Sequence, residues 1–153
     1  AQSIFIAKCR QMSVKCYNNS ITKYARKGEV MIIEIDFNSD EAIYLQLRNQ
    51  IVLGIATSRL QEGDSLPSVR HLAEEIGINM HTVNKAYAVL RQEGFITLDR
   101  KNGAVIAIDV NKLQALSELK KNLTMALAKA SCRNIAREEV HAMVEEILDA
   151  FES

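Results

Sequence analysis

The sequence is poor in residues that would cross-link a fold through disulfides or metal ions. Its 153 residues include only three cysteines and three histidines. Cys9, Cys16 and Cys132 form an odd set, and no two of them have the close spacing of a metal-ligand pair. Neither a disulfide framework nor a zinc site is therefore indicated, and we interpret all three as reduced thiols. The three histidines are scattered, so no metal-ligand set is indicated with them either.

Long apolar runs are absent too. No run approaches the roughly 18 to 20 residues that a membrane span requires. The first residues place no basic segment ahead of a sustained apolar stretch, as a secretory signal would. We therefore expect a soluble, cytoplasmic protein. Gly-rich phosphate loops, nucleophile motifs and paired-carboxylate motifs are also missing, so we expect neither enzymatic activity nor a cofactor.

Residues 66–103 contain two apolar series with a turn between them. The first, which stops at Gly77, has spacings of three and four: Val69, Leu72, Ala73 and Ile76. The second has similar spacings: Met80, Val83, Ala86, Tyr87 and Leu90. Ser68 and Asn79 can cap the starts of two short amphipathic helices, and Gly77 and Gly94 can end them. This pattern predicts a helix-turn-helix.

A short hairpin is expected directly after the second helix. Phe95, Ile96 and Leu98 on one side, and residues 104–108 on the other, flank the turn-like segment 99–103. A hairpin in this position makes the motif a winged helix-turn-helix. The expected fold class is therefore α+β and mostly helical.

The same region carries a motif of many positions in fixed order: Leu66-Pro67-Ser68-Val69-Arg70, Leu72-Ala73, Thr82-Val83-Asn84-Lys85-Ala86-Tyr87, Leu90 and Glu93-Gly94-Phe95-Ile96. The motif resembles the DNA-binding domain of GntR-type bacterial transcriptional regulators, over roughly residues 43–108. The resemblance implies a winged helix-turn-helix that binds double-stranded DNA. In the wing the family usually has a Gly-Lys-Gly-like tip, and here the chain has Lys101-Asn102-Gly103-Ala104, a departure that bears on the wing's contact and not on the fold.

The start of the second helix is expected to meet base edges in the major groove. Asn84 has the groups to pair with adenine, Thr82 to reach phosphate or a thymine methyl, and His81 to donate to guanine or phosphate. The alternative is that Asn79 is only a helix cap and Asn84 only a solvated side chain. Met80 completes the exposed candidates of this turn.

Other candidates flank that turn. Ser68 and Arg70 start the first helix, where free N–H groups favour a phosphate. The resemblance implies that Arg70 lies at the DNA, and its alternative is an ion pair with Glu74 four residues on. Lys85 and Tyr87 match the family motif, although Tyr87 also falls on the apolar stripe. The last three candidates form the wing tip, which would reach phosphate or the minor groove; the alternative is that the tip is only a solvated turn. The complete candidate set is Ser68, Arg70, Asn79, Met80, His81, Thr82, Asn84, Lys85, Tyr87, Lys101, Asn102 and Gly103.

Three segments are expected along the chain. Residues 1–30 have no clear period, and we interpret Met31 as the natural start, with 1–30 an added or misassigned extension; the alternative is a genuine basic arm that contacts DNA. Residues 31–109 form the winged helix-turn-helix domain. Within it, residues 31–37 alternate as a short strand or extended segment would, and residues 38–40 can cap a long helix with apolar positions at Ile43, Leu47, Ile51 and Ile55.

Residues 110–153 are expected to form two amphipathic helices. Their apolar stripes, which run from Leu113 to Ala130 and from Ala136 to Phe151, cannot both be buried against each other, so they need a partner. We favour a homodimer interface; the alternative is packing on the chain's own winged helix. So short an appendage resembles the YtrA-like branch of the family, which lacks the large effector domains of other branches.

The charge is balanced overall, with 19 Lys and Arg against 19 Asp and Glu. It is uneven along the chain: residues 1–30 hold six basic residues and one acid, residues 31–42 four acids, and residues 43–108 seven basic residues against six acids. A neutral protein can still present a positive face, but this balance predicts modest non-specific affinity and a need for two copies at one site.

The sequence therefore predicts a homodimeric transcriptional regulator that binds an inverted-repeat operator, and the family resemblance implies that it represses transcription by blocking polymerase. The alternative is a winged helix that binds proteins and not DNA. A thiol-based sensor or enzyme that uses Cys132 is a third class, and it would need a thiol of depressed pKa. The operator sequence, the regulated genes and any small-molecule effector lie beyond what the sequence indicates.

Overall fold

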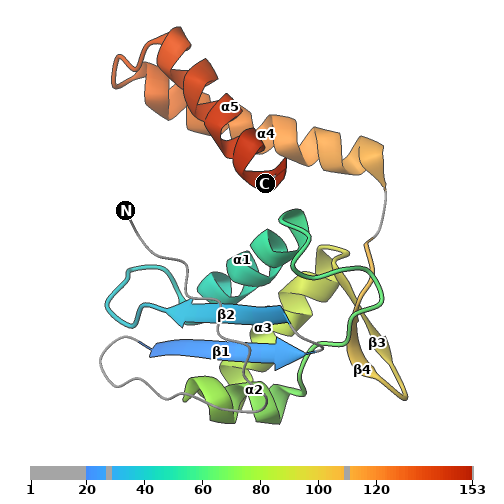
Figure 1. The fold of residues 1–153 in the computed structure, drawn as a ribbon. Coiled ribbons are helices and arrows are strands. Elements are labelled where there is room, and N and C mark those ends of the chain that lie inside the picture. Colours follow the sequence, from blue (N-terminus) through green and yellow to red (C-terminus); the bar gives the residue numbers. More distant parts are fainter. Residues whose placement is uncertain (1–19, 27–28, 109–110, 153) are drawn as a thin grey trace. The chain divides into compact units, whose positions relative to one another are not determined.

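The computed structural model describes residues 20–26, 29–108 and 111–152. The chain divides into two compact units, residues 1–108 and residues 109–153. The elements of the first unit are β1 (Ser20–Arg26), β2 (Glu29–Ile35), α1 (Ile43–Ala56), α2 (Val69–Ile76), α3 (Met80–Gln92), β3 (Ile96–Asp99) and β4 (Gly103–Ile106). Those of the second are α4 (Lys112–Ser131) and α5 (Arg137–Glu152). The predicted α+β, mostly helical class with a winged helix-turn-helix is confirmed (Figure 1).

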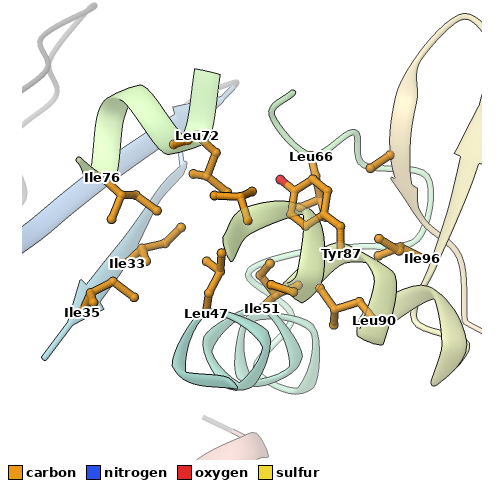
Figure 2. Close-up of a cluster of buried hydrophobic side chains, with 14 of the residues drawn as sticks. Ile33, Ile35, Leu47, Ile51, Leu66, Leu72, Ile76, Tyr87, Leu90 and Ile96 are labelled. Carbon is orange, nitrogen blue, oxygen red and sulfur yellow. The ribbon is translucent and has the colours of Figure 1, made fainter. Parts of the chain in front are cut away.

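The core of the first unit lies where α1, α2, α3 and β2 meet. Leu47 and Ile51 of α1 are fully buried, as the predicted stripe required. Figure 2 shows the surrounding side chains, which come from β2, the segment before α2, α2, α3 and β3: Ile33, Ile35, Leu66, Leu72, Ile76, Tyr87, Leu90 and Ile96. Full burial of one such aliphatic side chain is worth about 1.5–3 kcal/mol, so this cluster fixes how the helices are arranged.

Two antiparallel hairpins complete the unit. Strand β3 pairs with β4 from Ile96↔Ile106 to Asp99↔Gly103, which is the predicted wing. Strand β1 pairs with β2 from Ser20↔Ile35 to Arg26↔Glu29. The residues that we expected to be a strand or an extended segment thus form a strand, which begins at Glu29. The expected boundary at Met31 falls inside β2, residues 1–19 lie outside the described part, and the interpretation of 1–30 as an extension stays a prediction.

The start of α1 differs from the prediction. The cluster at residues 38–40 does not cap the helix, because the N-cap residue is Ala42, which has no side-chain acceptor. The cluster instead forms the preceding turn, in which Asp36 Oδ1 accepts from the N–H of Asn38 (2.9 Å) and Ser39 Oγ accepts from the N–H of Glu41 (3.1 Å). Short polar side chains favour such local bonds wherever they are not at the cap position.

Two glutamines of α1 hold strand β2. Gln46 accepts from the N–H of Asp36 (2.9 Å) and donates to the carbonyls of Asp36 (2.9 Å) and Glu41 (2.8 Å). Gln50 accepts from the N–H of Glu34 (2.8 Å) and donates to its carbonyl. A side-chain amide has both a donor and an acceptor, as a peptide group does. Gln46 and Gln50, which are four residues apart in the helix, therefore match two positions that are two residues apart in the extended chain: Asp36, directly after β2, and Glu34, within it.

The second unit consists of α4 and α5, and its apolar side chains are largely uncovered. Asn111 caps α4, with Oδ1 accepting from the N–H of Gln114 (3.3 Å). A turn with Asn134 at a φ of 56° separates α4 from α5, as residues 131–134 were expected to do. No described residue of α5 is buried. The exposed large apolar residues of the two helices are Leu113, Leu116, Leu119, Leu123, Met125, Leu127, Met143, Val144, Ile147 and Leu148.

Among the residues that the structure describes, none of the helices has both the length and the apolar character of a membrane span.

Candidate DNA interface

The helix-turn-helix has a side-chain cap at the start of each helix and a glycine in the turn between them. Ser68 accepts from the N–H of His71 (3.2 Å) at the start of α2, and Asn79 accepts from the N–H of His81 (2.8 Å) at the start of α3. Gly77 has a φ of 78°, and its N–H donates to the carbonyl of Ala73 (2.9 Å). All three predicted roles are present. Gly77 and the Asn79 cap, which lie between the two helices, fix the direction in which α3 leaves α2.

Replacement of Gly77 by alanine is expected to lower the free energy of unfolding by about 1–2 kcal/mol, because a Cβ disfavours the left-handed conformation. No heavy atom lies within 4 Å of the position that the Cβ would take, so the cost is conformational and not steric. Gly77→Asn is the matched control, since asparagine tolerates this conformation. Urea unfolding of the three proteins checks the order Gly, Asn, Ala, and equal stability of the two variants would contradict it.

The outward face of α3 carries most of the predicted recognition residues. Met80, His81, Asn84 and Lys85 are exposed, and Thr82 is half-buried. The opposite face is in the core: Val83, Ala86, Tyr87 and Leu90. Helix α3 therefore presents an amide, an imidazole, a thioether and an ammonium along one side, which are groups that can contact base edges and phosphates.

Tyr87 belongs to the buried face. Its side chain is 5% exposed, and its hydroxyl donates to the carbonyl of Pro67 (2.9 Å). Because Pro67 immediately precedes the cap of α2, this hydrogen bond fixes the start of α2 against α3. Figure 2 shows the Tyr87 ring among the buried side chains. This position favours the alternative interpretation of Tyr87 as a core residue and corrects its inclusion among the contact residues. Tyr87 matches the family motif at a position that serves packing. A buried tyrosine hydroxyl needs a hydrogen-bond partner, and here the carbonyl of Pro67 supplies it.

Arg70 forms an ion pair with Glu74, the alternative role considered for it. Its Nε donates to Glu74 Oε1 at 2.9 Å, and both side chains are mostly exposed, at 80% and 62%. This hydrogen bond, together with the negative charge of Glu74, raises the pKa of Arg70. An exposed pair of this kind is weak, so it does not prevent Arg70 from exchanging Glu74 for a phosphate.

Lys85 has a partner on α1. Its Nζ lies 3.9 Å from the centroid of the Tyr44 ring, within the range of a cation–π contact. Tyr44 is half-buried and packs against the core. It is absent from the residues predicted from the sequence, because no local spacing relates the first turn of α1 to the second turn of α3.

The wing is a tight hairpin with a polar tip. Asp99 Oδ1 accepts from the N–H groups of Lys101 and Asn102, both at 2.7 Å, and Gly103 has a φ of 74°. Lys101 and Asn102 are exposed, as is Arg100, which the candidate set omitted. The tip therefore presents two adjacent cations on a turn that Asp99 organises.

An ion pair that the sequence did not reveal ties α1 to the end of α3. Arg48 Nη2 lies 3.4 Å from Glu93 Oε1, and each side chain is about 30% exposed. Arg48 also donates to Asn49 Oδ1 (2.7 Å). Glu93 is part of the family-like motif, and its contact with α1 gives that position a structural role.

Titratable side chains do not gather into a metal site within residues 20–26, 29–108 and 111–152. Cys132 is exposed at the end of α4, while Cys9 and Cys16 lie outside the described residues. His141 pairs with Arg137, whose Nε lies 3.3 Å from His141 Nε2.

A capped helix-turn-helix, a polar outward face on its second helix and a basic wing define a winged-helix DNA-binding regulator. Residues 40–106 match the model of the bacterial regulatory proteins of the gntR family. The chain is 32% identical over 119 residues to the HTH-type transcriptional repressor YtrA of Bacillus subtilis, covering 76% of this chain and 92% of the relative. It belongs to the GntR family of transcriptional regulators, which act by binding DNA and not as enzymes.

Two solved structures are similar to this one. A structure described as a transcriptional antiterminator from Listeria monocytogenes is 30% identical, with a TM-score of 0.69, over 76% of this chain and 90% of that chain. YtrA from Sulfolobus acidocaldarius, described as a GntR-family transcription factor, is 40% identical, with a TM-score of 0.51, over 60% of this chain and 97% of that chain. The resemblance to the GntR family that the sequence indicated is thereby confirmed.

Proposed function

We propose that the protein is a homodimeric repressor that binds an inverted-repeat operator, with one winged helix on each half-site. The observation that carries the proposal is the uncovered apolar surface of α4 and α5, where large side chains such as Leu116 and Ile147 are about half exposed, at 51% and 48%. Contiguous apolar surface of this kind marks an interaction site. A second copy of the same two helices supplies a surface of matching chemistry, because a two-fold interface is self-complementary.

The weak charge of the winged helix supports the need for two copies. Residues 43–108 hold only one more basic residue than acidic ones, seven against six. A module that neutralises few phosphates binds DNA poorly alone. Two modules held by one dimer act as a bivalent ligand, so the second binding step becomes intramolecular.

The proposed contacts fall into three groups. Asn79, Met80, His81, Thr82 and Asn84 of the α3 start meet base edges, and Ser68, Arg70 and Lys85 meet phosphates on either side. Lys101, Asn102 and Gly103 of the wing tip reach the backbone or the minor groove. Ser68 and Asn79 also cap their helices, and the other N–H groups of each first turn, which have no partner within the helix, can donate to a phosphate.

Repression follows from occupancy of the operator, which excludes polymerase. The relative from Bacillus subtilis is described as a repressor, which supports this direction of regulation. Such a protein acts where bacterial DNA lies, in the cytoplasm.

Selection of bound fragments from a genomic library, followed by a salt-dependent mobility shift, tests the proposal. The expected result is enrichment of an inverted repeat that binds one dimer, with affinity that falls as salt rises. A protein that retains its fold but enriches no sequence would instead be a winged helix that binds proteins. Enrichment of single half-sites would contradict the homodimer.

Replacing Asn84 by alanine is expected to relax the preference at one base position in each half-site by about 1–3 kcal/mol, because alanine cannot form the bidentate pair with adenine. Gln92→Ala, at the exposed far end of α3, is the matched control and should leave the preference unchanged. The measurement is competition between the operator and single-base variants of it. Equal weakening on operator and random DNA would make Asn84 a positioning residue.

A further inference from the structure

Lys85 and Arg70 are the two cations beside the recognition turn, and their charges are held differently. Arg70 is paired with the carboxylate of Glu74, so it must exchange that partner before it binds a phosphate. Lys85 is held by the ring of Tyr44, with 3.9 Å between Nζ and the centroid. The ring has no formal charge. The ammonium of Lys85 is therefore positioned by a neutral group and remains able to bind an anion on its other sides.

The position of this pair is favourable for a phosphate contact. Lys85 directly follows Asn84 in α3 and is exposed, while Tyr44 is half-buried in the first turn of α1. Helix α1 packs against α3 (Figure 1). In a docked helix-turn-helix the phosphate strands border the groove that holds the recognition helix. A cation on the α1 side of α3 therefore faces one of these strands when the start of α3 lies in the groove.

A lysine side chain has many rotamers, and fixing it in a complex costs conformational entropy. A ring that already holds the ammonium in the free protein removes part of that cost before DNA arrives. The ring meets the ammonium on one side only, so N–H donors remain for a phosphate. The tyrosine hydroxyl has no part in this contact, which distinguishes it from a hydrogen bond.

We propose that Tyr44 is a positioning residue of the DNA interface, whose ring holds the Lys85 ammonium toward the phosphate backbone beside the recognition helix. This proposal rests on the proposed function. It assigns α1 a share in DNA binding that none of the sequence-predicted residues covers.

The test is a double-mutant cycle in DNA binding. Full-length wild type, Tyr44→Leu, Tyr44→Phe, Lys85→Gln and the double variant Tyr44→Leu/Lys85→Gln are titrated with the selected operator over a series of KCl concentrations. The slope of log K against log salt is negative. Lys85→Gln should make it less steep by about 0.9 for each phosphate that the side chain no longer neutralises. Tyr44→Leu should weaken binding about two- to fivefold, the strength of an exposed cation–π contact. Tyr44→Phe should bind as wild type does.

The cycle separates positioning from packing. In the Lys85→Gln background, Tyr44→Leu should have no further effect on DNA affinity. Any one of three results would overturn the proposal: equal weakening by Tyr44→Phe and Tyr44→Leu, additive effects in the double variant, or an unchanged salt slope for Lys85→Gln. Thermal melting accompanies every variant, and Tyr44→Met replaces Tyr44→Leu in the cycle if the latter melts early. A wild-type protein without salt-dependent operator binding would overturn the proposed function as well, and that result is distinct from a failed cycle.

Discussion

Replacement of both Leu119 and Leu123 by glutamate is expected to make the protein monomeric and to weaken operator binding more than about tenfold. Burial of one leucine is worth about 1.5–3 kcal/mol, and a symmetrical dimer contains each position twice. Both side chains are about half exposed in the single chain, at 53% and 43%, so their substitution should leave the fold of α4 intact. The measurements are light scattering for the mass and a mobility shift for the affinity.

Lys121→Glu is the control for charge. It lies on α4 between the two leucines but off their stripe, and it changes the charge of one chain by two units, as the double substitution does. The control should remain dimeric. A dimeric double-glutamate variant would move the interface away from this stripe. A wild-type protein that is monomeric at micromolar concentration would contradict the proposed assembly itself.

Insertion of five base pairs between the two half-sites of the operator is expected to reduce binding to the non-specific level. Specific occupancy requires two recognition helices about one helical turn apart, roughly 34–36 Å, on the same side of the duplex. Five added base pairs rotate one half-site to the opposite side. One winged helix alone neutralises too few phosphates to hold the remaining half-site tightly.

A mobility shift at fixed salt checks this expectation. The matched control replaces five central base pairs without changing their number, and it should bind as the natural operator does unless the protein reads the spacer's deformability. Equal affinity for the natural and the expanded operator would mean that the copies bind independently or are joined by a flexible tether.

The helix-turn-helix was predictable because its signals are local. Ser68, Gly77 and Asn79 mark helix ends by their own chemistry, and the apolar spacing around them is regular. The wing was predictable for the same reason, since Gly103 supplies the left-handed residue that a tight turn needs. The two helices of this motif and the wing were therefore placed correctly, whereas the capping cluster at residues 38–40 did not mark the start of α1.

The features that the sequence did not reveal depend on contacts between distant residues. Strand β1 was not predicted, because residues 20–26 lack a clear period and become a strand only by pairing with β2. The contact between Tyr44 and Lys85 joins two helices that are far apart in the sequence. Tyr87 is buried with its hydroxyl donating to the carbonyl of Pro67, a residue twenty positions earlier. The positions that match the family motif include both buried residues that pack in the core and exposed residues that can contact DNA. Only the burial seen in the structure distinguishes the two kinds.

The amides of Gln46 and Gln50 have a consequence for how copies of this protein can associate. A strand with a free row of peptide groups recruits strands from other molecules and promotes aggregation. Strand β2 has β1 along one side, and the peptide groups of Glu34 and Asp36 are already bonded to the two glutamines. These positions therefore offer no template for a foreign strand, which protects this edge of the unit from open-ended strand pairing between molecules.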